Sequence, residues 1–157
     1  MEVGGATVPV VEVTETFFYV AAAITAWLVA QGLKYVIASF KGKRVSSPRQ
    51  LYLSGGMPSA HSATTVALVV AIGGIEGVNS SVFAVALLMS AVVMYDAIMV
   101  RRSSGEQGES LTALIKEQKS KVRLPRVAKG HTPVEVLAGA ALGVIIGLVV
   151  IFIQNQV

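Results

Sequence analysis

The sequence predicts an all-α integral membrane protein: a bundle of about four transmembrane helices, with a short amphipathic helix in a cytoplasmic loop. Of the 157 residues, 54% are hydrophobic and 14% are charged, which is too apolar for an ordinary soluble domain. Long apolar runs alternate with polar segments, as expected of helices that cross a hydrocarbon core about 30 Å thick. All 13 Lys and Arg residues lie between Lys34 and Lys129, so both ends of the chain lack positively charged side chains.

The apolar runs give the expected helices in chain order. They cover residues 17–40, 58–75, 81–100 and 132–153. Residues 1–16 contain acidic but no basic side chains and are expected to form an extracytoplasmic lead-in, whereas 17–157 form a single membrane-embedded domain. The segment 103–130 is polar and basic. Within it, Leu111, Leu114 and Ile115 recur at helical spacing, which predicts the amphipathic helix near the interface.

The distribution of basic residues predicts the orientation. With four spans, the basic loops 41–57 and 103–130 fall on one side, and both termini fall on the other. Basic loops mark the cytoplasmic face, so the protein is expected in a bacterial cytoplasmic or an organelle membrane with these loops inside. The net charge of +4 is explained by this asymmetry, and no nucleic-acid partner is expected.

Two stretches carry the chemistry, and each precedes an apolar run. The first is Ser-Gly-Gly-Met-Pro-Ser-Ala-His-Ser-Ala-Thr-Thr at 54–65, in which Pro58 suits a first helical turn and Ser59 can cap the helix. The second is Lys-Gly-His-Thr-Pro-Val-Glu at 129–135, with Gly130 directly before His131. Helix starts favour anions. We therefore expect His61 and His131 to belong to two halves of one phosphate site.

Four further charged residues are candidates for binding the phosphate. Lys34 and Asp96 lie at similar depth near the cytoplasmic helix ends, and an intramembrane carboxylate usually has a partner. Arg101 and Arg102 follow the third apolar run, where helix-end anchoring is the alternative role. The chain has no cysteine, and its histidines and carboxylates lack metal-ligand spacing, so neither a metal nor another cofactor is expected.

Glu135 has two possible roles that the sequence leaves open. Thr132-Pro133-Val134-Glu135 fits a capping box with proline at the first helical position. Alternatively, the carboxylate orients His131 by a hydrogen bond, as in a catalytic triad.

Residues along the fourth helix recur at four-residue intervals, and most of them are small. His131 and Glu135 are followed at the same four-residue interval by Gly139, Gly143 and Gly147. Glycines at this spacing let membrane helices approach closely, either inside the bundle or in a homodimer.

The motifs resemble the divergent branch of the type-2 phosphatidic acid phosphatases, a superfamily that also includes acid phosphatases and vanadium haloperoxidases. The resemblance rests on Gly-Gly-Met-Pro-Ser-Ala-His-Ser-Ala at 55–63, Asp96 with Val-Arg-Arg at 100–102, and Gly-His-Thr-Pro-Val-Glu-Val at 130–136. It implies that His131 is the nucleophile, His61 the proton donor to the leaving group and Lys34 a phosphate ligand. Ala60 replaces a glycine of the pattern, and Glu135 an aspartate. Pro125 stands where the pattern has an arginine, which Arg101 or Arg102 is expected to replace.

The expected function is therefore that of a metal-independent lipid phosphatase. It would hydrolyse a phospholipid monophosphate or a polyprenyl mono- or diphosphate at the cytoplasmic face, through a phosphohistidine intermediate. The first alternative is a non-catalytic protein that binds or transports phosphorylated lipids or anions. The second is a structural membrane subunit, which would leave the two motif-bearing helix starts without a purpose.

Overall fold

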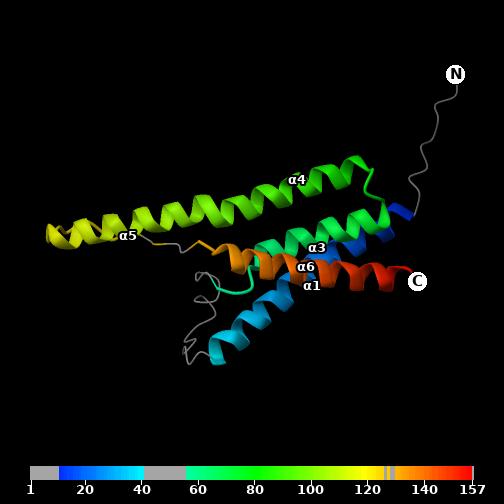
Figure 1. Ribbon diagram of the computed structural model, residues 1–157, viewed down its shortest axis with the longest axis horizontal. Helices are drawn as coiled ribbons and strands as arrows, with labels where there is room; N and C mark the ends of the chain where they lie inside the picture. The colour runs from blue at the N-terminus through cyan, green and yellow to red at the C-terminus, as the bar shows by residue number, and fades with distance from the viewer. Residues whose placement is uncertain (1–10, 41–55, 126, 128–129, 157) are drawn as a thin grey trace, which may run out of the picture.

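The computed structural model describes residues 11–40, 56–125, 127 and 130–156, and within these residues it is helical with no strand. Figure 1 shows the elements in order. They are α1 (Val11–Phe40), α3 (Ala60–Ile75), α4 (Ser81–Tyr95), the π-helix η1 (Asp96–Val100), α5 (Arg101–Glu117) and α6 (Pro133–Gln154). The predicted all-α class is confirmed.

Three stretches of the described chain are long and apolar enough to cross a membrane: Glu15–Phe40, Ser81–Glu117 and Pro133–Gln154. The remaining predicted span, 58–75, corresponds to α3, an apolar helix of 16 residues. At 1.5 Å per residue it rises about 24 Å, less than the ~30 Å hydrocarbon core. The fold is thus a membrane bundle in which α3 is shorter than its neighbours.

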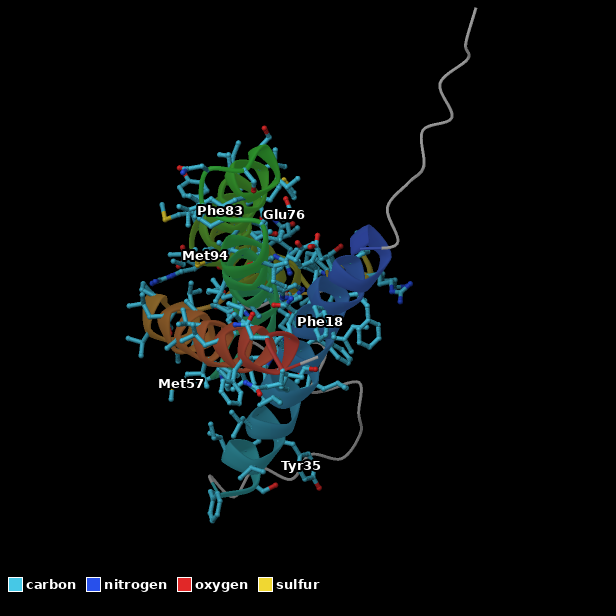
Figure 2. All side chains as sticks on the ribbon, turned by 90° about the vertical axis from the view of Figure 1, so that its right-hand side faces the viewer. Phe18, Tyr35, Met57, Glu76, Phe83 and Met94 are labelled. Carbon is cyan, nitrogen blue, oxygen red and sulfur yellow. The ribbon has the colours of Figure 1, made fainter. Side chains whose placement is uncertain are left out.

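α1, α3 and α6, here called the three-helix unit, pack through small residues at four-residue intervals. α1 buries Ala22, Ala26 and Ala30, and α3 buries Ala63, Ala67 and Ala71. Among lipid tails there is little hydrophobic drive for helices to associate, so close van der Waals contact between backbones provides much of the stabilisation. Figure 2 looks along the bundle from the end where α1 begins and α6 ends, with Phe18 among these helices and Tyr35 on the outside.

The glycines of α6 face α3. A methyl group added at Gly139 would lie 2.3 Å from the carbonyl oxygen of Ser59, and one at Gly143 would lie 2.5 Å from that of Ala63. At Gly147 it would lie 2.6 Å from the Val70 side chain. The seam is therefore filled by α3 of the same chain. The homodimer stays a prediction. The glycine seam does not support it, because the seam is already occupied within one chain.

α4, η1 and α5 form one continuous element, here called the long helix, which packs chiefly against α3 and extends beyond the bundle (Figure 1). The prediction that the third helix ends at Arg101-Arg102 is wrong. The basic pair resembles a membrane-edge anchor, but the residues that follow include Glu, Gln, Leu and Lys, which are good helix formers. The amphipathic segment is accordingly the end of a long helix rather than a separate short one.

The other helix boundaries differ less from prediction. α6 begins at Pro133 with Thr132 as its N-cap, as predicted. α1 begins at Val11 rather than at Phe17, so residues 11–16 of the predicted lead-in are helical, and 1–10 lie outside the described residues. α3 begins at Ala60, because Ser59 is the N-cap. Pro58 therefore precedes the cap instead of occupying the first helical turn.

Candidate active site

The starts of α3 and α6 are joined directly through their backbones. The Ser59 N–H donates to the carbonyl oxygen of Glu135 at 2.9 Å. The Ser59 hydroxyl caps α3, accepting from the Ser62 N–H at 3.4 Å and from the Ser62 hydroxyl at 2.9 Å. Ser59 is fully buried, so here it positions the start of α3. Its predicted contact with phosphate stays a prediction that requires the hydroxyl to turn outward.

His131 is held at two points. Its backbone N–H donates to the carbonyl oxygen of Ala97 in η1 at 3.0 Å. Its ring Nδ1 lies 3.2 Å from Glu135 Oε2. The side chain is buried, with the residue 8% exposed. The loop before α6 is thereby fixed to the long helix on one side and to the first turn of α6 on the other.

Glu135 combines the two roles that the sequence left open. Its Oε2 accepts a hydrogen bond from the Thr132 N–H at 3.0 Å, and its own N–H donates to the Thr132 hydroxyl at 3.3 Å, which completes a capping box. The same Oε2 contacts His131 Nδ1. One carboxylate oxygen thus caps the helix and orients the imidazole in a single arrangement.

This contact also defines the chemical state of His131. A carboxylate oxygen accepts this hydrogen bond when Nδ1 carries the ring proton, which leaves the lone pair on Nε2. Burial lowers the pKa of the His131 imidazole below its usual value, and the neighbouring charges of Lys34 and Arg101 act in the same direction, while Glu135 acts against them. Burial therefore favours the neutral imidazole over the charged form, and the neutral form is the one that can act as a nucleophile.

Lys34 enters the same region from α1. The residue is only 8% exposed, and its aliphatic stem lies beside Gly56, where an added methyl group would be 3.9 Å from Lys34 Cδ. Gly56 has a φ of +139°, a conformation that a residue with a side chain rarely adopts. The Lys34 ammonium interacts electrostatically with Glu135 and with both histidines. A buried lysine from α1 thus acts electrostatically on residues at the starts of both α3 and α6.

The two arginines are separated by the structure. Arg101 is paired with Asp96 through its Nε, and its charge acts on both His61 and His131. Arg102 instead pairs with Glu106 at 3.1 Å on an exposed surface. Its backbone is in tight contact with Gly130, where an added methyl group would lie 2.5 Å from the Arg102 nitrogen. Arg101 is accordingly the better placed of the pair to meet an anion.

His61 completes the cluster from the first turn of α3. It is exposed, in contrast to His131, and it interacts electrostatically with Arg101, His131, Lys34 and Asp96. The side chains brought together at this end of the bundle come from α1, α3, η1, the first residue of α5, the loop before α6 and the first turn of α6. They are Lys34, His61, Asp96, Arg101, His131 and Glu135.

Sequence reasoning missed the part played by η1. In this π-helix the Arg101 N–H donates to the carbonyl oxygen of Asp96, five residues back, and the Ala97 carbonyl accepts from His131. Single π-turns are frequent at functional sites. No pattern in residues 96–100 distinguishes this turn from an α-helix, so the sequence offered no signal for it.

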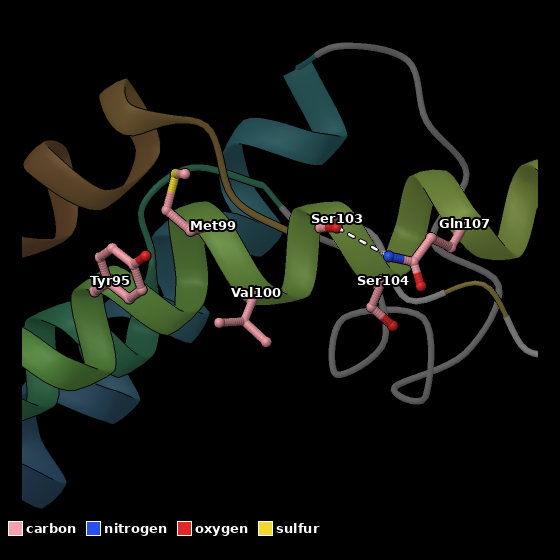
Figure 3. Close-up of a pocket in the computed structure, with 6 residues that line it drawn as sticks. All are labelled: Tyr95, Met99, Val100, Ser103, Ser104 and Gln107. Atoms are coloured by element: carbon pink, nitrogen blue, oxygen red, sulfur yellow. Dashed lines mark hydrogen bonds between the residues drawn. The ribbon is translucent and has the colours of Figure 1, made fainter.

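A hollow on the described surface lies elsewhere. A shallow depression of about 420 Å³ is lined by Tyr95, Met99, Val100, Ser103, Ser104 and Gln107 (Figure 3). None of the predicted site residues lines it, and its lining carries no charge. In the part of the chain that the structure describes, no group of three or more His, Asp or Glu residues is arranged to hold a metal ion. The predicted site residues therefore lie in the charged cluster and not in this depression.

The fold and the cluster define an all-helical membrane protein with paired histidines and cations at one end of its bundle. The chain belongs to the Divergent PAP2 family, whose model matches residues 16–146. It is 32% identical over 114 residues to the uncharacterized membrane protein YuiD of Bacillus subtilis (strain 168), an alignment that covers 63% of this chain and 72% of YuiD. No solved structure matches the chain.

Proposed function

We propose that the protein is a metal-independent phosphatase that hydrolyses a phosphorylated membrane lipid. The observation that carries this proposal is the contact of His131 Nδ1 with Glu135 Oε2 at 3.2 Å, which puts the lone pair on Nε2 of a neutral imidazole. Membership in the Divergent PAP2 family supports the same reaction class.

In the proposed reaction, His131 Nε2 attacks phosphorus, a P–N bond forms and the P–O bond to the lipid breaks. His61 donates a proton to the departing alkoxide, which general acids accelerate by roughly 10²–10⁴-fold. His61 then takes a proton from water as that water attacks the phosphohistidine, releasing inorganic phosphate and restoring neutral His131. Lys34 and Arg101 stabilise the charge on the phosphoryl oxygens.

The proposed substrate is a phospholipid monophosphate or a polyprenyl mono- or diphosphate that enters from the cytoplasmic leaflet. The support is the clustering of basic residues at the end of the bundle that carries the histidines. A cysteine in place of Lys121, in a chain that has none of its own, should react with a membrane-impermeant maleimide only after cells are opened. Labelling in intact cells would reverse the orientation.

The deciding experiment is phosphate release by the purified protein from a panel of lipid phosphates. His131→Ala should lose roughly 10⁴–10⁶-fold of the wild-type rate, the range seen when a member of a nucleophilic constellation is removed. It should also fail to form a phosphoenzyme in a rapid acid quench. Thermal unfolding in detergent checks that the variant is folded. Near-wild-type turnover by folded His131→Ala would exclude the phosphohistidine mechanism.

The second candidate function is non-catalytic binding of phosphorylated lipids. It is favoured by the outward position of Arg102 and by Pro125 standing at the place of a superfamily arginine, which together leave fewer cations for the transition state. Saturable binding of a lipid phosphate by wild type, lost in Lys34→Ala and accompanied by no turnover, would establish this function in place of the phosphatase.

A further inference from the structure

One polar atom in the interior has no partner in the fold. Among the described residues, the Gln31 side-chain oxygen Oε1 is the sole buried side-chain nitrogen or oxygen without a hydrogen bond. Burying a carbonyl oxygen without a donor is costly, and native interiors contain few such groups. The free-energy penalty is greater for a residue inside a membrane-spanning stretch, because lipid offers no hydrogen-bond donor either.

Gln31 lies on the face of α1 that leads into the active site. Residues three or four positions apart on an α-helix are separated by about 60° or 40° around its axis, so Trp27, Gln31 and Lys34 share one face. Trp27 packs against the hydrophobic core, and Lys34 is buried in the charged cluster. Gln31 therefore stands between the core and the phosphate-binding cation, roughly 4.5 Å deeper in the membrane than Lys34.

The chemistry of this oxygen restricts what it can bind. An amide oxygen only accepts hydrogen bonds, and the oxygens of an ionised phosphate also only accept. The group that satisfies Gln31 must therefore carry an N–H or O–H, and it must sit slightly deeper than the phosphate held by Lys34.

We propose that Gln31 is a substrate-positioning residue whose Oε1 accepts a hydrogen bond from a hydroxyl that the lipid carries next to its phosphate. This inference rests on the proposed phosphatase function and narrows its substrate class. It selects a hydroxyl-bearing lipid monophosphate, of which a lysophosphatidate is the simplest example. A polyprenyl phosphate has a hydrocarbon chain with no donor, so it leaves the oxygen unsatisfied.

The test combines a matched pair of substrates with a matched pair of variants. The substrates are 1-acyl-glycerol-3-phosphate and its 2-deoxy analogue, which differ only in the hydroxyl, presented in the same detergent micelles. Gln31→Met keeps the length of the side chain and removes the acceptor. Leu33→Met introduces the same side chain two residues away, at a position that is 41% exposed.

Wild type and Leu33→Met should prefer the hydroxyl substrate by roughly tenfold in kcat/KM, the effect of one neutral hydrogen bond. Gln31→Met should lose this preference and hydrolyse the deoxy analogue at the wild-type rate.

Equal rates of wild type on the two substrates would overturn the inference while leaving the phosphatase proposal intact. This comparison needs only the wild-type protein, so it holds even if Gln31→Met does not fold. If folded Gln31→Met lost the same factor in kcat/KM on both substrates, the inference would also be overturned. Gln31 Oε1 would then bind the attacking water and not the substrate hydroxyl. Failure of wild type to hydrolyse any lipid phosphate would defeat the proposed function itself, and the inference with it.

Discussion

The three-helix unit and the long helix are built in opposite ways. The three-helix unit brings backbones into contact, because its facing positions are glycine and alanine. Within the long helix, α4 buries Ser90 alone, whose hydroxyl donates to Thr65 Oγ1 at 3.1 Å. Many direct backbone contacts make the first region stiff, whereas the second depends on few buried contacts and is expected to open more easily.

The residues of the candidate site are therefore divided between a stiff region and a more mobile one. Both histidines, Glu135 and Lys34 are carried by the three-helix unit or by the loop directly before α6, whereas Asp96 and Arg101 are carried by the long helix. Groups that must be held to a fraction of an ångström are best placed on rigid elements. We therefore expect the stiff region to provide the chemical groups, and the long helix to provide a charge that can move with the substrate.

The largest expected effect concerns the chemical groups. His61→Ala should slow hydrolysis of a lipid phosphate by roughly 10²–10⁴-fold, because the alkoxide leaving group needs a proton. With p-nitrophenyl phosphate, whose leaving group is stable as an anion, the loss should be much smaller. Steady-state rates on both substrates give the comparison. Equal losses on the two would show that His61 does not act as the acid.

A smaller effect is expected from the long helix. Arg101→Ala should weaken kcat/KM by roughly ten- to a hundredfold, the effect of a charge-assisted hydrogen bond. Arg102→Ala is the matched control, because this side chain pairs with Glu106 on the surface, and it should stay within about twofold, as expected for an exposed ion pair. Competitive inhibition by inorganic phosphate provides a second readout. Similar losses in the two variants would contradict the assignment of Arg101 to the site.

The stiffness of the three-helix unit can be tested with one methyl group. Gly143→Ala places it 2.5 Å from the Ala63 carbonyl oxygen, and overpacking of this kind destabilises by about 1–3 kcal/mol. At Gly32 an added methyl group meets nothing within 4 Å, so Gly32→Ala should change stability by less than about 0.5 kcal/mol. Thermal unfolding in detergent compares the two. Identical midpoints would refute the packed seam.

The subtlest effect is on pH dependence. Burial places the pKa of His131 below 6.5, and Glu135 acts to raise it. Glu135→Gln removes that negative charge, so the pKa should fall further and less of the imidazole should be protonated at any acidic pH. The acid limb of kcat/KM should therefore lie below pH 6.5 in wild type and move to still lower pH in the variant. A shift to higher pH would mean that another group controls this limb.

The same pKa shift predicts how stability depends on pH. The unfolded chain binds a proton at His131 with the ordinary pKa of 6.5, whereas the folded protein binds it only at lower pH. Below 6.5 the unfolded state therefore holds more protons, and this contribution to stability decreases as the pH falls.

Local signals explain which features the sequence predicts well. Thr132, Pro133 and Glu135 specify the start of α6 through capping chemistry alone, and the four-residue glycine interval specifies the face on which α6 packs. The clustering of His61 with His131 follows from the topology of the spans.

Features that depend on helical phase or on tertiary packing were not predictable. Arg101 and Arg102 are adjacent and chemically identical, and only the turn before them decides which one reaches the histidines. The continuity of α4 with α5 was missed because the basic pair also fits a helix end. The alanine stripe of α1 was overlooked because alanine is unremarkable in any apolar helix, and it becomes informative only when Ala22, Ala26 and Ala30 are all seen to be buried.

The π-turn at Asp96–Val100 has a consequence for how this chain can vary. A turn closed by a bond to the fifth preceding residue holds one residue more than an α-turn, and one residue corresponds to about 100° of rotation. Deleting a single residue there would keep the long helix intact yet turn all of α5 by that angle about its axis, carrying Arg101 off the histidines and bringing another side chain round. Related chains should therefore conserve the number of residues between Tyr95 and Arg101 more strictly than the identity of the residues between them.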